Sequence, residues 1–238
     1  AGDLVFDVGA PLGDRAAAFS ALGARVVALE PQPFLVPWLR RLVGGKEGVT
    51  VVQEAVGREE GRTRLWVSPA TPTVSTVAQE WKERLPEANP TFRGVRWDES
   101  VEVPVTTLDR LIRRYGTPGF CKIDVEGHEA EVLDGVGRAL PPLSVEFVAG
   151  GLEVAQACVR RLQELGTYEF NAVGGEERRF LLDGWVSGEA ILGWLEAGAD
   201  DRSSGDLYAR LAGRVGPEGS GPAARPAPAD PRPDPERP

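Results

Sequence analysis

Short apolar runs and amphipathic stretches alternate along most of this 238-residue chain. Mostly apolar runs of about five residues, such as 4–8 and 120–124, are typical of strands in the interior of a sheet. The longer stretches between such runs repeat apolar residues at helical spacing, as 152–165 does. Repeated strand–helix units predict a mainly parallel sheet with helices on both of its faces.

Individual residues indicate where these elements begin and end. Asp14 is expected to cap the first helix, and Gly23 to end it. Pro104 interrupts an alternating segment, which predicts an edge strand, because proline cannot donate a hydrogen bond to a neighbouring strand. Apolar residues at helical spacing predict a helix over 74–81. Further strands are expected at 25–30, 49–53, 62–68, 101–105, 143–147, 168–173, 180–182 and 206–211, and further helices at 34–43, 108–115, 129–133 and 191–195.

The last 24 residues differ in composition from the rest of the chain. Residues 215–238 hold eight of the twenty prolines, no aromatic residue and one valine. Such a segment buries too little apolar surface to offset its chain entropy, so a disordered or extended tail is expected. A proline-rich docking motif is the alternative interpretation. The folded domain is therefore predicted to span 1–214.

Composition excludes several classes of protein. A net charge of −9 argues against a nonspecific nucleic-acid binder, which needs a basic surface. No apolar run approaches the ~20 residues of a membrane span, and no signal peptide opens the chain, so a cytoplasmic protein is expected. Arginine greatly outnumbers lysine and methionine is absent, which is typical of a GC-rich bacterial genome.

Cysteine and histidine are too scarce for two kinds of site. Cys121 and Cys158 lie in separate apolar stretches, so buried reduced thiols are expected rather than a disulfide. His128 is the single histidine, so we expect no histidine metal site, and the sequence predicts no other metal. A Ser/His/Asp hydrolase is also disfavoured, because no GxSxG motif is present.

A glycine-containing turn joins the first strand to the first helix and predicts a ligand site. The turn, Gly9–Gly13, reads GAPLG, and glycines let the backbone pass close to a ligand at a helix start with free N–H groups. Glu30 closes the second strand, 21 positions after Gly9, where a carboxylate accepts the hydroxyls of a ribose. The alternative is a tight turn and a surface glutamate.

The same turn does not fit a dinucleotide. Pro11 stands where the fingerprint G-x-G-x-x-G has its second glycine, and Asp7 at the strand end repels phosphate. A carboxylate favours a cationic ligand with an amino-acid end. S-adenosylmethionine carries an ammonium, a sulfonium and a ribose, and the residue types of Asp7, Gly9, Gly13 and Glu30 suit it.

Ionisable residues are densest where one buried strand ends. The stretch Lys122–Glu129 reads KIDVEGHE and follows the apolar start of its strand. Carboxyl ends of parallel strands line the ligand crevice in sheets of this kind. Asp124 and Glu126, two positions apart, are expected to point the same way on the strand. The alternative is an ordinary helix start, where Glu126 and Glu129 favour the helix dipole.

With these motifs, the chain resembles the FkbM-type methyltransferases, a class I family that depends on S-adenosylmethionine. The most specific match is the KIDVEG stretch, and the matches run in family order across about 5–150. Pro11 departs from the family pattern, which has asparagine there. The other matching stretches are 5–10, 28–31, 54–57, 105–109 and 144–146.

The resemblance implies a Rossmann-like fold with a mostly parallel seven-stranded sheet whose last hairpin is reversed. It also implies a cofactor site. Asp7, Gly9 and Gly13 would hold the methionine part, with Ala10 in the same motif. Glu30 would hold the ribose, next to Pro31. Glu54 and Ala55 would flank the adenine, and Asp124 would lie near the sulfonium and the acceptor.

The function implied is O-methylation of a hydroxyl on a small molecule or a sugar. Asp124, Glu126 and Lys122 are the expected catalytic residues, with Glu126 as the general base and Lys122 pairing with a carboxylate. His128 is the alternative base. Two alternative functions stay open: a binding module of the same fold without turnover, made credible by Pro11, and a nicotinamide-dependent oxidoreductase.

Overall fold

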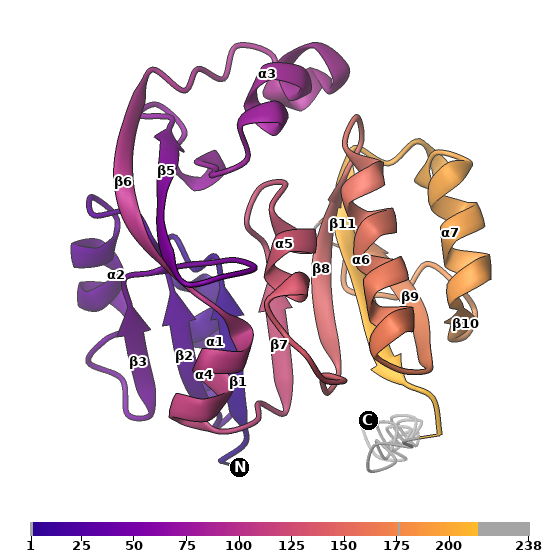
Figure 1. Cartoon of the computed structure of the whole chain (residues 1–238), viewed down its shortest axis with the longest axis horizontal. Helices are drawn as coiled ribbons and strands as arrows, with labels where there is room; N and C mark the ends of the chain where they lie inside the picture. Colours follow the sequence, from indigo (N-terminus) through magenta and orange to yellow (C-terminus); the bar gives the residue numbers. More distant parts are fainter. Residues whose placement is uncertain (1, 176, 214–238) are drawn as a thin grey trace, which may run out of the picture.

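A computed structural model of the protein describes residues 2–175 and 177–213 (Figure 1). Within them, one large sheet has the strand order β10-β9-β11-β8-β7-β1-β2-β3. Five neighbouring strands, from β3 to β8, are parallel, and β11 runs antiparallel between β8 and β9. The strands are β1 (Leu4–Val8), β2 (Arg25–Leu29), β3 (Val49–Val52), β7 (Phe120–Ile123), β8 (Leu143–Val148), β9 (Tyr168–Gly174), β10 (Val186–Ser187) and β11 (Ser204–Leu211).

Helices cover both faces of this sheet. On one face α4 to α7 pack over the largest hydrophobic core, which takes Leu4, Phe6 and Val8 from β1. On the other face α1 and α2 pack over β2 through a smaller core that holds Ala16 and Leu39. The helices are α1 (Asp14–Ala21), α2 (Val36–Leu42), α4 (Leu108–Tyr115), α5 (Glu129–Asp134), α6 (Leu152–Leu165) and α7 (Gly188–Glu196), and a short 3-10 helix η3 (Ala199–Asp201) follows α7.

Residues 55–106 form a cap beyond the carboxyl ends of the parallel strands (Figure 1). A second sheet, in the order β4-β6-β5, supports it. Leu65 and Val103 form the small buried core of this sheet together with Ala55. The cap contains β4 (Ala55–Val56), β5 (Gly61–Val67), η1 (Pro72–Val74), α3 (Gln79–Ala88), η2 (Pro90–Phe92) and β6 (Glu99–Thr106).

The predicted fold class is confirmed, including the mostly parallel sheet and the reversed last hairpin. The large sheet has one strand more than the seven expected, because the two-residue β10 adds to its edge. Both cysteines are buried and free, as predicted. None of the helices in the described residues is long and apolar enough to cross a membrane. The predicted tail and its boundary after residue 214 lie outside the described residues.

Four local predictions are wrong. Gly13, with φ 78°, takes the N-cap position, so Asp14 is the first helical residue instead of the cap. The apolar residues of 74–81 do not share one helix, because a turn separates η1 from α3. Residues 180–182 form no strand, although the Leu181 amide donates to the carbonyl of Ala172 at 2.8 Å.

The fourth error concerns β6, which is the central strand of the second sheet and not an edge. Its proline is nevertheless accommodated. β4 pairs with β6 only at Val105 and Thr106, so Pro104 lies outside that pairing and faces β5 at Arg62. Because β4 is so short, Pro104 has a neighbouring strand on one side only, as it would on an edge strand.

Gly9 fixes the meeting point of β1, β2 and β7. Its φ is 84°, and a Cβ atom there would lie 1.7 Å from the carbonyl oxygen of Asp124. Its amide and that of Ala10 both donate to the carbonyl of Leu29, at 3.0 and 2.9 Å, and the Asp124 amide donates to Val8 at 2.9 Å. The carboxyl ends of three strands are thereby held in contact.

Gly9→Ala should therefore destabilise the protein by at least about 2 kcal/mol, since the new methyl group meets both a left-handed backbone and an occupied position. Gly45→Ala is the matched control, because a Cβ at Gly45 has no atom within 4 Å. The free energy of unfolding in urea measures the difference. Equal stability of the two variants would contradict the close contact between Gly9 and Asp124.

Candidate functional site

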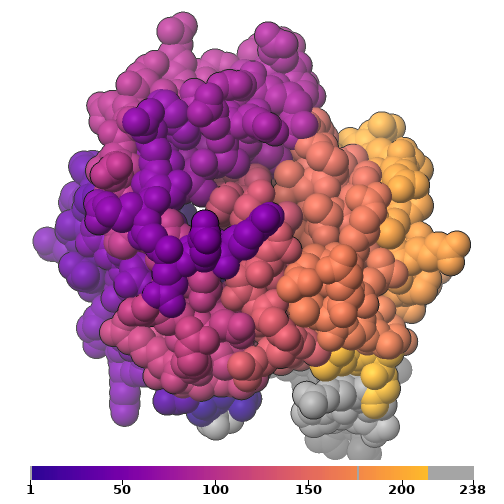
Figure 2. Space-filling view, in the orientation of Figure 1, coloured from indigo at the N-terminus to yellow at the C-terminus, as the bar shows by residue number. Residues whose placement is uncertain are grey.

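A pocket lies at the carboxyl ends of β1, β2 and β7, beneath the cap, which packs closely over the body of the protein (Figure 2). Six predicted site residues line it together with Glu126: Gly9, Glu30, Pro31, Glu54, Ala55 and Asp124. A neighbouring hollow shares Gly9, Pro11 and Asp124 with the pocket. The remaining predicted residues, Asp7, Ala10, Gly13 and Lys122, line that hollow. The fold thus brings all the sequence-predicted site residues into two adjoining spaces.

The glycine turn offers fewer backbone donors than the sequence predicts. The amides of Gly9 and Ala10 are both used by the carbonyl of Leu29. Pro11 has no amide hydrogen at all. Residues 9–11 therefore have no backbone amide left for a ligand, and the glycine at position 9 serves the packing of Asp124.

Two acidic side chains at the ends of β1 and β2 are buried without an opposite charge in hydrogen-bond contact. Asp7 is 1% exposed, and among the described residues neither of its carboxylate oxygens makes a hydrogen bond of ordinary geometry, although the backbone amide of Ala16 lies near it. Burial raises the pKa of Asp7 to about 6, against the lowering effect of Lys122. An unpartnered buried carboxylate is a place for a cationic ligand group, such as an ammonium.

Glu30 is 4% exposed and accepts a hydrogen bond from the Gln32 amide at 2.8 Å. Burial raises its pKa to about 7. Such a carboxylate suits neutral hydroxyl donors, and its place at the end of β2 is the one expected for a ribose. Asp7 and Glu30 together fit the charged and hydroxylated parts of S-adenosylmethionine.

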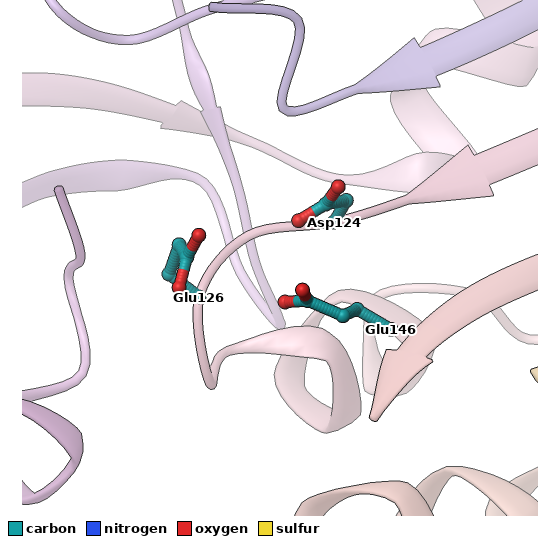
Figure 3. Close-up of side chains that lie close together, drawn as sticks. All are labelled: Asp124, Glu126 and Glu146. Carbon is teal, nitrogen blue, oxygen red and sulfur yellow. The ribbon is translucent and has the colours of Figure 1, made fainter. Parts of the chain in front are cut away.

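Asp124, Glu126 and Glu146 turn their carboxylates toward one another (Figure 3). One oxygen of each lies within 4.8 Å of the others. Lys122 donates from Nζ to Oδ2 of Asp124 at 2.6 Å, as predicted for a lysine that pairs with a carboxylate. Burial, and next the charge of Asp124, raise the pKa values of Glu126 and Glu146 well above the ordinary range. We call these three residues the carboxylate cluster.

The two carboxylates after β7 meet through a turn and not along a strand, which corrects the sequence interpretation. β7 ends at Ile123, and Glu126 has a φ of 56° in the left-handed region. Gly127 follows with φ 91°, and a Cβ there would lie 2.3 Å from Cδ2 of Trp81. The turn is therefore tightly enclosed, and it turns Glu126 back toward Asp124.

Glu129 holds this turn from the first turn of α5. Its side chain is buried and accepts hydrogen bonds from the amides of Val125, at 2.9 Å, and Gly127, at 3.1 Å. On the cap side, the hydroxyl of Thr76 donates to the carbonyl of Glu126 at 2.6 Å. The helix-start interpretation thus applies to Glu129, whereas Glu126 belongs to the pocket.

Some site residues were missed by sequence reasoning. Glu146 appeared only as part of a family match, although a glutamate inside an apolar strand was an available signal. Thr73 and Ser75 of the cap line the pocket, and Gln32 joins the cap to β2 by donating from Nε2 to the carbonyl of Pro72 at 2.8 Å. No local pattern marked these three, because the path of the cap brings them to the site.

His128 lies at the rim of the same pocket but outside the carboxylate cluster. Its Nδ1 is 3.6 Å from Oε2 of Glu131, and burial lowers its pKa. A neutral imidazole can accept a proton. The alternative of a histidine base therefore stays open beside the carboxylates.

Comparison with known proteins gives one family match. The model of one family, described as "Methyltransferase FkbM domain", matches residues 7–149. No curated protein matches the chain.

Several solved structures have a similar arrangement at low sequence identity. Precorrin-6y C5,15-methyltransferase from Geobacter metallireducens GS-15 is 15% identical, with 88% of this chain and 81% of that chain covered and a TM-score of 0.43. An rRNA methylase from Streptococcus thermophilus is 9% identical (88% and 87% covered, TM-score 0.44). A SAM-dependent methyltransferase from Aquifex aeolicus is 13% identical (87% and 81% covered, TM-score 0.40). At this level of similarity none of them indicates a substrate.

The raised pKa of Glu30 predicts a pH-dependent stability. In the unfolded chain Glu30 ionises near pH 4.5, but in the folded protein only near 7, so folding is opposed once the pH exceeds 4.5. A rise from pH 5 to pH 8 should therefore lower the free energy of unfolding by about 2–3 kcal/mol through this group. In Glu30→Gln the free energy of unfolding should fall by that much less between pH 5 and pH 8, as measured by urea unfolding at both pH values.

The exposed Glu47 provides the control for this prediction, since Glu47→Gln changes the same group at the surface. It should keep the pH dependence of the unsubstituted protein. Identical pH dependence of Glu30→Gln and Glu47→Gln would contradict the assignment of a buried, protonated Glu30.

Proposed function

This chain belongs to the FkbM methyltransferase family, and we propose that it methylates a hydroxyl group of a small molecule or a glycan. The family uses S-adenosylmethionine, which is therefore the cofactor here. When bound, it supplies a methyl group on a positively charged sulfur, which takes the bonding electron pair as the methyl group leaves. Family membership removes the nicotinamide-dependent alternative.

The observation that carries the proposal is the pair of buried acidic residues at the ends of β1 and β2. Within the described residues neither oxygen of Asp7 makes a hydrogen bond of ordinary geometry, and Asp7 would receive the ammonium of the methionine part. Glu30 would receive the ribose hydroxyls, while Glu54 and Ala55 on the adjoining wall would flank the adenine. Asp124 lines both adjoining spaces and would lie beside the transferred group.

The residues of the carboxylate cluster supply what an oxygen acceptor needs. The acceptor hydroxyl has to lose its proton as its oxygen is methylated, and Glu126 is the carboxylate that takes this proton. Removal of the proton contributes about 10²–10⁴ in rate. Lys122 holds Asp124 by a 2.6 Å hydrogen bond, so Asp124 has a fixed orientation toward the reacting groups. Alignment of the two reactants supplies a further ~7–11 kcal/mol.

One observation favours a second candidate, a cofactor-binding protein without turnover. Pro11 lacks an amide hydrogen, and the amides of Gly9 and Ala10 are occupied by Leu29. The turn therefore gives the methionine part little backbone support. This candidate and the enzyme make the same prediction for cofactor binding and differ only in methyl transfer.

Methyl transfer is tested by incubating the full chain with S-adenosylmethionine that carries a radiolabelled methyl group and a panel of sugars and hydroxylated macrolides. We expect label in an acceptor, in a form that resists mild base, as a methyl ether does and a methyl ester does not. Label in a base-labile product would contradict O-methylation of a hydroxyl. Cofactor binding with no labelled product would favour the second candidate.

Glu30→Ala should weaken the binding of S-adenosylhomocysteine by roughly 10- to 150-fold, because two hydroxyl hydrogen bonds to a charged group are lost, worth about 1.5–3 kcal/mol. Titration calorimetry at pH 8 measures this dissociation constant. Glu47→Ala, at an exposed site, should leave it unchanged. An unchanged constant for Glu30→Ala would remove Glu30 from the cofactor site.

Asp124→Asn and Glu126→Gln should each lower turnover at least ~100-fold, with a far smaller change in affinity for S-adenosylhomocysteine. The reason is that both side chains act on the acceptor and the transferred group more than on the rest of the cofactor. Initial rates on a labelled acceptor, beside calorimetry, measure the two effects. Normal turnover in both variants together with inactive His128→Ala would assign the proton transfer to the histidine.

A further inference from the structure

The carboxylate cluster has the dimensions of a cation site. Asp124 and Glu126 come from the turn after β7, and Glu146 comes from the adjacent strand β8 (Figure 3). One oxygen of each lies within 4.8 Å of the other two. Oxygen ligands around one divalent cation lie about 2.0–2.6 Å from it, and hence about 3–5 Å from one another. Small side-chain shifts bring all three oxygens onto one ion.

A second observation points to a ligand that is not part of the chain. Glu126 and Glu146 each have an Oε2 atom that is out of contact with solvent and has no hydrogen-bond partner among the described residues. Buried polar atoms in proteins are almost always paired. The indole N–H of Trp81 lies near Glu126 without a hydrogen bond of ordinary geometry, so the oxygen of Glu146 is the stronger indication of a group between the carboxylates.

The charges around the cluster show which sign this group has. Acidic groups predominate around Glu146: Asp124, Glu126 and Glu129 act on it, together with one base, Lys122. The lysine is already engaged by Oδ2 of Asp124, and Glu129 by the amides of the turn. A group that binds between the carboxylates would therefore be positive, and it can still use the second oxygen of Asp124.

We propose that Asp124, Glu126 and Glu146 bind one divalent cation of the Mg²⁺ or Mn²⁺ type. Three carboxylates without histidine or cysteine are the donor set of such oxygen-preferring ions and not of zinc. Three protein ligands leave about three positions of an octahedral ion for water or substrate. Ligation through one oxygen also leaves Glu126 a second oxygen for the acceptor proton.

The consequence for the substrate rests on the proposed methyl transfer. An ion with free positions next to the transferred group binds an acceptor through two neighbouring oxygens, such as a vicinal diol. The cation also favours the deprotonated hydroxyl, which is the better nucleophile. The acceptor class thus narrows from any hydroxyl compound to one with adjacent oxygen donors.

Binding of Mn²⁺ to the full chain tests the site without any turnover. Titration followed by the electron paramagnetic resonance signal of free Mn²⁺ should show one ion per chain, displaced by excess Mg²⁺, with or without S-adenosylhomocysteine. Glu146→Gln should weaken Mn²⁺ binding at least 10-fold. Because Glu146 does not line the cofactor pocket, the Glu146→Gln protein should bind S-adenosylhomocysteine as tightly as the unsubstituted protein does.

The control is Glu47→Gln, which makes the same substitution at an exposed position and should bind Mn²⁺ like the unsubstituted protein. Glu126→Gln serves as the second variant if Glu146→Gln does not fold, as judged by circular dichroism. Absence of Mn²⁺ binding by the unsubstituted chain, with and without S-adenosylhomocysteine, overturns the site. Equal Mn²⁺ affinity of the cluster variant and the control also overturns it.

The two proposals fail in distinguishable ways. Mn²⁺ bound at the cluster, with no methyl transfer to any acceptor, supports the cation site and counts against the function. Methyl transfer that continues in EDTA, from a chain without affinity for Mn²⁺, supports the function and rejects the cation.

Discussion

The carbonyl oxygen of Asp124 occupies the space that a side chain on Gly9 would need, and the arrangement of the site depends on this contact. It holds the end of β7 against the end of β1. The carbonyl of Leu29 accepts both amides of the turn and thereby adds the end of β2. Carboxylates at three strand ends consequently line adjoining walls, although 117 positions of sequence separate Asp7 from Asp124.

These carboxylates make the pocket electrostatically costly. Burial opposes the ionisation of Asp7, Glu30, Glu126 and Glu146. The charge of Lys122 counteracts this for Asp7, Glu126 and Glu146, and that of Arg15 does so for Asp7. Native structures accept such a cost where a ligand of opposite charge offsets it. A cationic cofactor at one end of the pocket and a metal ion at the other would together offset the cost of the buried carboxylates.

The sequence predicted the fold class and most strands because their apolar runs are long and clearly bounded. The ligand end of the sheet was also predictable, since Asp7 lies near the end of its strand and Glu30 and Asp124 directly follow theirs. Glu126 was placed in the pocket for the wrong reason: its left-handed φ brings it to Asp124, and no strand periodicity does so.

The remaining site residues could not be predicted because they depend on tertiary structure. Thr73 and Ser75 reach the pocket only because Gln32 ties the cap to β2, which a local pattern does not reveal. The pairing of Pro104 with β5 alone depends on the length of β4, a strand of two residues without a signal of its own.

The hydrogen bond from Thr76 to the carbonyl of Glu126, with Trp81 packed against Gly127, joins the cap to the turn that carries a reacting carboxylate. Any displacement of residues 76–81 would break that bond and expose a turn whose left-handed backbone depends on its surroundings. The position of the Glu126 carboxylate therefore depends on the cap as well as on the large sheet.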